Sequence, residues 1–339
     1  MGSGLRKKAL LYHCRIPAAW RLRFAAVLCV LCCGLLSGCR TAAYTYGTRA
    51  DYVTSPQLKA RPQLERGRPQ AFVDGFGWVW GIPSKLILFD RRVENHRVSR
   101  ETEQAIAEYL AANELHTVKV RVNQYAPGDD WKRLGQNTSV GAGWRYTLGV
   151  LSVAGETVFP GRLFGGDHYN PFTNTIHLYS DVPAIAVHEG GHAKDFARRR
   201  WKGTWAAFYL VPGAPLWHES IATSDALTWL AEDNNPESLR EGYRILYPAY
   251  GTYAGSIFSD PTGISYVAGV LAGHAAGRWH ASRVPERIPR RILEQAAGAG
   301  SKSREDSEAD ESEGFEFPTS AAAESELEAE ADEQDWEER

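Results

Sequence analysis

The spacing of apolar and polar residues predicts an α+β protein whose ordered body begins near Phe76. Residues 117–123 (TVKVRVN) alternate between apolar and polar side chains, which is the period of a strand with one buried face. Residues 85–90 (KLILFD), 145–152 and 174–179 are further strand candidates, separated by glycine-rich turns. Helical patterns dominate after these strands, so the sequence predicts a sheet followed by a mainly helical C-terminal part.

The clearest amphipathic helix lies between two of these strands, over residues 99–114. Ser99 is a candidate N-cap, and Glu101 and Glu103 place negative charge in the first turn, where the helix dipole favours it. Thr102 stands where a full capping box would need Glu or Gln, so the box is incomplete. We expect a helix that starts at Ser99 and packs one apolar face on the sheet.

Three more helices are expected in the second half of the chain. One runs from about residue 180 to Arg200, with Pro183 in its first turn, where proline is well tolerated. A second spans roughly 216–231, and a Gly- and Ala-rich helix occupies about 263–279. The last of these is shorter than a bilayer span and contains His274, so we expect it to pack inside the protein.

The N-terminus has the features of a secretory signal. Six basic residues lie within residues 6–23, and an apolar run of 13 residues follows, from Phe24 to Leu36. That run is too short to span a bilayer comfortably and has the length of a signal-peptide core. All five cysteines lie in residues 14–39, so a metal bound by the remainder of the chain must use His, Asp or Glu.

The apolar run ends Leu36-Ser37-Gly38-Cys39, which resembles the lipobox of bacterial lipoproteins. The resemblance implies that residues 1–38 are removed and that acyl chains on Cys39 hold the protein on membrane lipid in the bacterial cell envelope. Arg40, in place of Asp, favours the outer membrane by the same resemblance. A single uncleaved membrane helix is the alternative interpretation.

Charge and composition separate two flexible segments from the body. Residues 39–75 are rich in Arg, Pro, Gly and Gln and are expected to form a tether. Residues 298–339 are strongly acidic, poor in apolar residues and expected to be disordered. The body at 76–297 is close to neutral, which gives no reason to expect nucleic acid as a partner.

The strongest chemical signal is His188-Glu189-Gly190-Gly191-His192. On a helix, His188 and His192 lie one turn apart on one side, so both imidazoles can reach one zinc ion. Glu189 lies beside that ion and is placed to act as a general base. Gly190 and Gly191 each cost about 1 kcal/mol in a helix interior, and close approach of another backbone or of a substrate would explain them.

A zinc site of this kind needs a third protein ligand and an open position. Asp195 and Arg198 stand where a metzincin would place Gly and His, and Gly251-Thr252 lacks the following Asp of an aspzincin. Trp217-His218-Glu219 begins a second helical segment and resembles the gluzincin arrangement, in which a Glu from a following helix completes the site. His218 remains a rival third ligand.

The resemblance covers roughly residues 80–235 and implies a zincin-like fold, with a mixed β-sheet packed on the active-site helix. It makes His188, His192 and Glu219 the ligands of Zn²⁺ and Glu189 the catalytic base. Gluzincins often have Asn before the ligand Glu and Asp four residues after it; here those places hold His218 and Thr223.

Other polar residues are candidates for supporting roles around this site. Asp195, three residues after His192, is placed to accept a hydrogen bond from a ligand imidazole, or else to pair with Arg198 or Arg199. Residues 174–179 match the edge strand on which zincins bind extended substrates, and His168 and His177 lie nearby. For oxyanion stabilisation the sequence offers three candidates, Tyr253, Tyr266 and His274.

Together these patterns predict a membrane-anchored zinc metallopeptidase that hydrolyses a peptide or protein substrate on the periplasmic or outer side of the envelope. The sequence leaves open a catalytically inactive envelope lipoprotein that keeps the zincin fold as a binding module. It also leaves open amide hydrolysis on a cell-wall peptide, and a structural protein in which the motif is fortuitous.

Overall fold

The computed structural model describes residues 62–233, 235–257 and 263–286. The predicted signal peptide, Cys39, most of the expected tether and the acidic tail lie outside the described residues. The described part is an α+β structure with a small mixed sheet and a large helical content. None of its helices is both long enough and apolar enough to cross a membrane.

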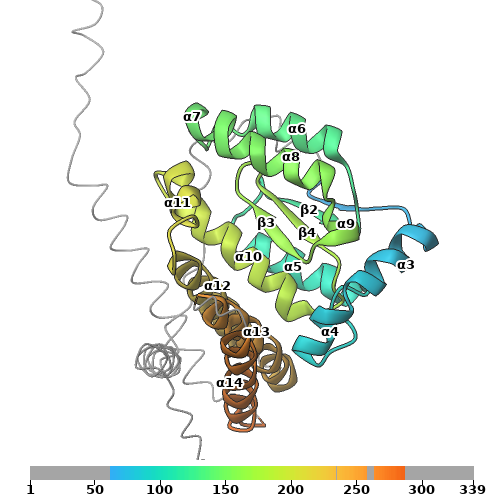
Figure 1. The fold of residues 1–339 in the computed structure, drawn as a ribbon, viewed down its shortest axis with the longest axis vertical. Coiled ribbons are helices and arrows are strands. Elements are labelled where there is room, and N and C mark those ends of the chain that lie inside the picture. Colours follow the sequence, from blue (N-terminus) through green and yellow to red (C-terminus); the bar gives the residue numbers. More distant parts are fainter. Residues whose placement is uncertain (1–61, 234, 258–262, 287–339) are drawn as a thin grey trace, which may run out of the picture.

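The sheet has four strands in the order β1-β2-β4-β3 (Figure 1). The first three in that order are parallel, and β3 lies antiparallel to β4 at the edge. Every residue of β2 and β4 is buried, as expected for central strands that are covered on both faces. The strands are β1 Leu64–Arg66, β2 Lys119–Val122, β3 His168–Asn170 and β4 Thr175–Leu178.

The two faces of the sheet differ in chemistry because side chains alternate along each strand. Val120, Val122, Ile176 and Leu178 belong to the main apolar core, together with residues of α5 and α10. The alternate positions of β2 and β4 are polar and lie on the side of α6 and α8 (Figure 1). The four helices are α5 Arg100–Ala112, α10 Pro183–Arg198, α6 Pro127–Gln136 and α8 Val150–Val158.

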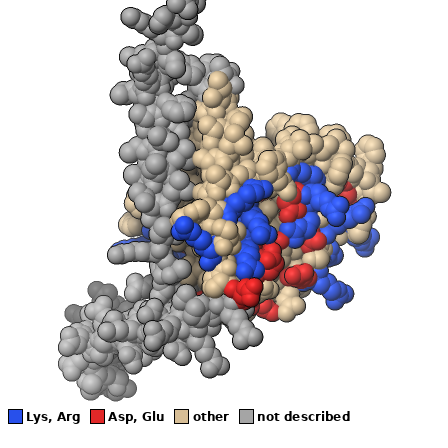
Figure 2. Space-filling view, turned by 90° about the horizontal axis from the view of Figure 1, so that it is seen from below, with Lys and Arg blue, Asp and Glu red and all other residues tan. Residues whose placement is uncertain are grey.

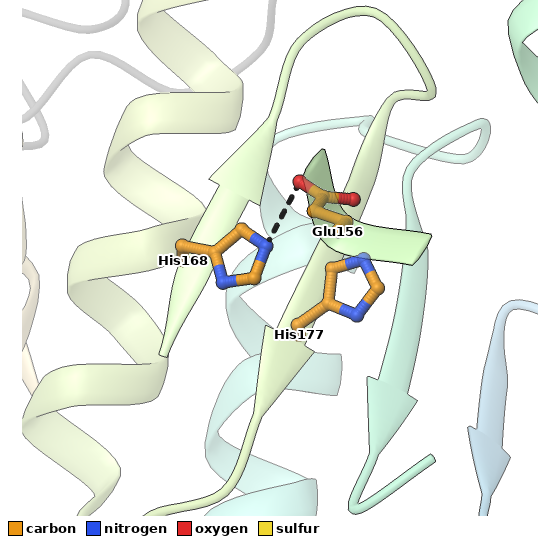
Figure 3. Close-up of side chains that lie close together, drawn as sticks. All are labelled: Glu156, His168 and His177. Atoms are coloured by element: carbon orange, nitrogen blue, oxygen red, sulfur yellow. Dashed lines mark hydrogen bonds and ion pairs between the residues drawn. The ribbon is translucent and has the colours of Figure 1, made fainter. Parts of the chain in front are cut away.

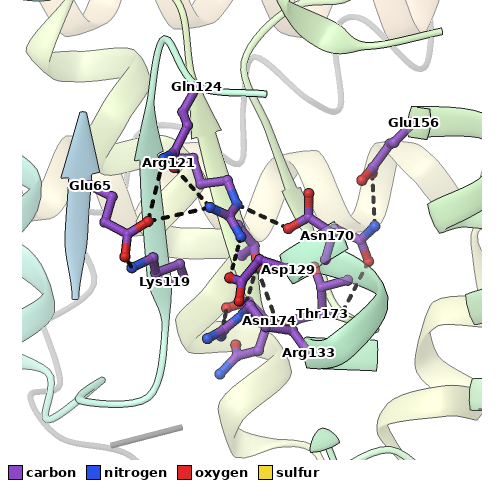
Figure 4. A network of polar contacts seen from close by, with 12 residues as sticks. Glu65, Lys119, Arg121, Gln124, Asp129, Arg133, Glu156, Asn170, Thr173 and Asn174 are labelled. Carbon is purple, nitrogen blue, oxygen red and sulfur yellow. Dashed lines mark hydrogen bonds and ion pairs between the residues drawn. The ribbon is translucent and has the colours of Figure 1, made fainter. Parts of the chain in front are cut away.

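A buried ionic network occupies the polar side of the sheet (Figure 4). The guanidinium of Arg121 is fully buried and donates to Asp130 at 2.9 Å and to Asp129 of α6. Arg133 of α6 donates to backbone carbonyls at the start of β4, and Lys119 pairs with Glu65 of β1. Charged groups buried in this way must be paired to remain charged, so the network fixes α6 on the sheet.

Three long helices form the C-terminal part, and α13 and α14 pack against each other without intervening side chains. A Cβ on Gly251 would lie 2.3 Å from the carbonyl oxygen of Gly269, and one on Gly273 would lie 2.5 Å from that of Tyr247. Glycine is therefore required where the two backbones meet. The helices are α12 Ala214–Glu232, α13 Pro236–Ser256 and α14 Ile264–Ala281.

Shorter helices complete the described structure, and both signs of charge are intermixed on the face seen in Figure 2. The shorter elements are α3 Ala71–Trp80, α4 Ile82–Leu88, α7 Ala142–Trp144, the π-helix η2 Arg145–Gly149, α9 Gly161–Phe164 and α11 Lys202–Phe208.

Several sequence expectations are confirmed by these elements. The strands at 117–123 and 174–179 are β2 and β4, and the helices expected at 180–200, 216–231 and 263–279 are α10, α12 and α14. Ser99 caps α5, with its hydroxyl accepting from the backbone N–H of Thr102 at 3.3 Å. The long helix α13 was not expected, because it contains Pro248 and several glycines, residues that disfavour a helix interior.

Two expected strands are wrong. Residues 85–90 contribute to α4, which has Pro83 in its first turn and ends at Phe89 in a left-handed conformation. Residues 145–152 form η2 and the start of α8. Short apolar runs fit a buried helix as well as a strand, and long-range packing decides between them.

The expected start of the ordered body at Phe76 is also wrong. Leu64–Arg66 pairs in parallel with β2, and α3 begins at Ala71. The ion pair between Glu65 and Lys119 holds β1 in place, and a pairing across 54 residues is not visible as local periodicity. The last part of the expected tether at 39–75 therefore belongs to the fold.

Two glycines place α10 between its neighbours α5 and α12. A Cβ on Gly190 would lie 2.6 Å from the ring of Tyr109 on α5, and one on Gly191 would lie 3.0 Å from the carbonyl oxygen of Ala222 on α12. The expected close approach of another backbone is confirmed at Gly191, whereas Gly190 instead makes room for a side chain. The approach at Gly191 brings α12 within reach of the histidines of α10.

We predict that Gly190→Ala lowers the free energy of unfolding by about 1–3 kcal/mol, because the new methyl group overlaps the buried ring of Tyr109. The matched control is Gly155→Ala in α8, where a Cβ meets nothing within 4 Å and stability should rise by up to about 1 kcal/mol. Denaturant unfolding of both variants measures the effect. Equal stability of Gly190→Ala and the wild type would contradict the packing.

Candidate metal centre

Two histidines of α10 and one carboxylate of α12 meet at a single point. The Nε2 atoms of His188 and His192 are 3.1 Å apart. Glu219 places Oε2 at 3.2 Å from His188 Nε2 and Oε1 at 3.4 Å from His192 Nε2. All three residues are buried. The structure thus brings together the three residues expected to bind a metal.

We call the two Nε2 atoms and the Glu219 carboxylate the ligand triangle, and its dimensions resemble those of the ligands around a tetrahedral ion. Ligand atoms about 2.0–2.1 Å from a tetrahedral zinc ion are separated from each other by roughly 3.3 Å. The three observed distances lie close to that value. Two imidazole nitrogens that face each other this closely need a proton or a cation between them, and the carboxylate adds negative charge. Because different oxygens of Glu219 face the two imidazoles, the carboxylate spans both rings, and this donor set suits a divalent cation.

The contact between α10 and α12 explains why Glu219 reaches the histidines. Gly191 lies against the backbone of Ala222, one turn beyond Glu219 on α12. Asp225, on the following turn, accepts hydrogen bonds from Lys194 of α10, at 2.8 Å, and from the hydroxyl of Tyr109. These buried bonds lock α12 to α10 and α5 on the far side of the ligand triangle.

Electrostatics within the triangle favours an ionised Glu219. Burial alone would raise the pKa of the Glu219 carboxyl, but His192 and His188, through charge and hydrogen bonds, hold that pKa far below its usual range. An ionised carboxylate is the form that binds a divalent cation.

The ring of His188 is oriented by Thr223. Its Nδ1 lies 3.4 Å from the hydroxyl oxygen of Thr223, which follows Glu219 by one turn. This is the position where the gluzincin pattern commonly has Asp. A hydroxyl here keeps Nε2 directed at the triangle, so Thr223 takes the orienting role for this ring.

Glu189 is buried beside the ligands on α10. Burial raises the pKa of its carboxyl to about 7, with further increases from the negative charges of Glu219 and Asp167 and opposing effects from His188 and His168. A carboxylate with a pKa near neutrality is suited to accept and return a proton.

Asp195 does not take the role expected of it. Its carboxylate accepts from Arg199, with Nε at 3.0 Å, and from the indole N–H of Trp205 at 2.7 Å. No hydrogen bond joins it to the ring of His188 or His192 within the described part of the chain. The pairing with Arg199 is the alternative role considered for Asp195. The bond from Trp205 draws its carboxylate towards α11.

His218 lies outside the ligand triangle, although it precedes Glu219. Its ring is 1% exposed and sits among four aromatic rings, with centroids at 3.9 Å to Tyr209 and 4.2 Å to Trp205. Neither ring nitrogen has a hydrogen-bond partner among the described residues. Burial lowers the pKa of His218 to about 4, so the ring is neutral. The structure therefore gives no support to His218 as the third ligand.

Of the three oxyanion candidates, Tyr253 lies nearest the triangle. Burial and the charges of Glu219 and Glu189 raise the pKa of its phenol, and it also hydrogen-bonds with Glu219. Tyr266 interacts electrostatically with Tyr253. The ring of His274 stacks on Phe89 and its Nε2 lies 2.7 Å from the carbonyl oxygen of Ile87, which places it away from the ligands.

Two further expectations concern the sheet. Residues 174–179 contain β4, which lies between β2 and β3 and is therefore not an edge strand. The edge strand next to α10 is β3. His168 and His177 come together with Glu156 in a second cluster, shown in Figure 3. Glu156 carried no motif and lies on α8, whose start was expected to be a strand.

Comparisons with family models, with curated proteins and with solved structures found no match to this chain.

We predict that Asp195→Asn leaves zinc affinity unchanged and lowers the free energy of unfolding by about 1–2 kcal/mol, because it weakens a buried charge-assisted hydrogen bond to Arg199. Zinc titration and denaturant unfolding of the same preparation separate the two effects. A zinc affinity reduced by roughly tenfold or more would instead assign Asp195 to the orientation of a ligand ring.

Proposed function

We propose that this protein is a zinc-dependent peptidase of the zincin type, with His188, His192 and Glu219 as ligands of the ion. The observation that carries the proposal is the convergence of the three side chains: the two imidazole nitrogens lie 3.1 Å apart, and each lies 3.2–3.4 Å from one oxygen of Glu219, close to the spacing of ligands around a tetrahedral zinc ion. Three protein ligands leave one position open, which distinguishes a catalytic from a structural zinc site. The α+β architecture, with the motif helix packed on a mixed sheet, is compatible with a zincin-like fold.

Zinc supplies two effects when bound: it polarises a substrate carbonyl and lowers the pKa of a water molecule to about 7. The chain itself supplies the proton transfer. Glu189 accepts the proton of the attacking water and returns it to the departing amine. The buried position of Glu189 keeps that proton from exchanging freely with solvent, and its raised pKa favours the step in which it accepts the proton.

Tyr253 is the group best placed to donate a hydrogen bond to the oxygen of the tetrahedral intermediate. It is 39% exposed, so a substrate can reach it, and its phenol interacts electrostatically with both Glu219 and Glu189. Its phenol remains protonated at neutral pH, because burial and the two carboxylates raise its pKa.

The edge strand β3 offers a place for the substrate backbone. It ends the described sheet next to α10, and an extended peptide can add to such an edge through main-chain hydrogen bonds. His168 of β3 acts electrostatically on Glu189, which indicates that the edge runs close to the proposed base. We propose a peptide or protein substrate, on the envelope side of a membrane to which acylated Cys39 anchors the chain.

The experiment that tests this function pairs metal analysis with hydrolysis of a fluorogenic peptide library. Glu189→Gln should keep its zinc and lose activity by roughly 10²–10⁴-fold, because it removes the base and spares the ligands. His188→Ala and Glu219→Ala should each lose the zinc of this site together with activity.

An exposed histidine provides the matched control. His116→Ala changes an imidazole at the surface and should alter neither zinc content nor activity. Full hydrolytic activity of Glu189→Gln would refute the assignment of the base, and a zinc content equal to that of the wild type in both ligand variants would refute the site.

We further predict that Tyr253→Phe lowers kcat by roughly 10²–10³-fold with zinc content unchanged, the loss typical of one oxyanion donor. Tyr266→Phe is the control, because Tyr266 neighbours Tyr253 and lacks its contact with Glu219. Steady-state kinetics on a substrate found in the library screen measures both. A change in KM alone for Tyr253→Phe would assign the phenol to substrate binding.

A further inference from the structure

A second group of metal-binding side chains lies on the polar side of the sheet, separate from the ligand triangle. His168 of β3 and His177 of β4 are directly opposed in the antiparallel register, and their rings stack at 4.6 Å between centroids. Glu156 reaches over both rings from α8 (Figure 3). Opposed positions on neighbouring strands bring two side chains to the same face within contact distance.

The contacts within this cluster leave two buried polar atoms without partners. Nε2 of His168 lies 3.2 Å from Oε1 of Glu156, and Asn170 donates to the same oxygen at 2.7 Å. Glu156 Oε2 and His177 Nε2 have no hydrogen-bond partner among the described residues, although His177 is only 5% exposed. Buried polar atoms of this kind are destabilising unless something binds them.

The space beside these atoms has the size of one small ligand. The two histidines and Glu156 line a cavity of about 10 Å³, together with Asp130 and Tyr179. A cavity of that volume holds a single water-sized occupant. A group that satisfies a carboxylate oxygen and an imidazole nitrogen at once is either a water molecule or a metal ion.

We infer that a second divalent transition-metal ion, zinc in the first instance, binds to His168, His177 and Glu156. One ligand atom from each residue lies within 4.8 Å of the others, and two ligands of one zinc ion are at most about 4.1 Å apart. Small rotations of the rings are enough to close that difference. Two imidazoles and one carboxylate suit zinc and its neighbours and are less suited to calcium or magnesium.

The buried Nε2 of His177 has no hydrogen-bond partner among the described residues, so it is the ring nitrogen left to bind an ion in the cavity. The ion would join β3, β4 and α8, and would thereby fix the sheet edge that lies next to α10.

Metal counting on the purified full-length chain in detergent tests this inference. After removal of all metal with a chelator and dialysis against Zn²⁺, the wild type should hold two equivalents. His177→Ala should hold one, His188→Ala should hold one, and the double variant none. His116→Ala is the imidazole control and should hold two.

Glu156→Gln provides a variant of nearly unchanged shape in case His177→Ala fails to fold. It should weaken the second equivalent by roughly tenfold or more while the first is unaffected. One equivalent in the wild type, lost in His188→Ala, overturns the second site and leaves a water molecule in the cavity. One equivalent lost in His177→Ala and kept in His188→Ala overturns the proposed catalytic site and leaves the second site standing.

Discussion

The crossing of α12 over α10 at Gly191 is the contact on which the rest of the site depends. Because Gly191 has no side chain, the backbone of Ala222 approaches it closely, and Glu219 is carried one turn back along α12 to the histidines. The hydrogen bonds that Lys194 and Tyr109 donate to Asp225 hold the same crossing from the other side. The cost of a glycine in a helix interior is thus offset by a contact that a larger residue would push apart.

The helix α10 could be predicted from the sequence because its signals are local. Pro183 marks its start, and the two histidines one turn apart mark its functional face. The prediction that Glu219 is the third ligand came from resemblance to the gluzincin arrangement, because no local pattern shows which helix crosses α10. The bond of Asp195 to Trp205 and the role of Thr223 were missed for the same reason, since both depend on which side chains of different helices lie opposite each other, whereas the local pairing of Asp195 with Arg199 was one of its two expected roles.

The polar side of the sheet shows where local reasoning fails. Alternation along residues 117–123 identified β2, and it suggested that one face would meet solvent. Instead Arg121 is fully buried under α6, paired with Asp129 and Asp130. Only long-range pairing makes such burial tolerable, and a single sequence does not display those pairs. Glu156 was overlooked on similar grounds, since its partners come from β3 and β4.

The two clusters of histidines are linked through Glu189. The Glu219 carboxylate lies on one side of this residue, and Asp167 and His168 act on it from the sheet side. Asp167 accepts from the backbone N–H groups of Tyr179 and Ser180, so its charge is fixed at the end of β4. A cation at the ligand triangle would favour ionised Glu189, whereas burial and Asp167 oppose ionisation. The pKa of Glu189 therefore depends on the loop that carries Asp167 and on the strand that carries His168, as well as on α10. A change in the sheet edge would change the pKa of the proposed base.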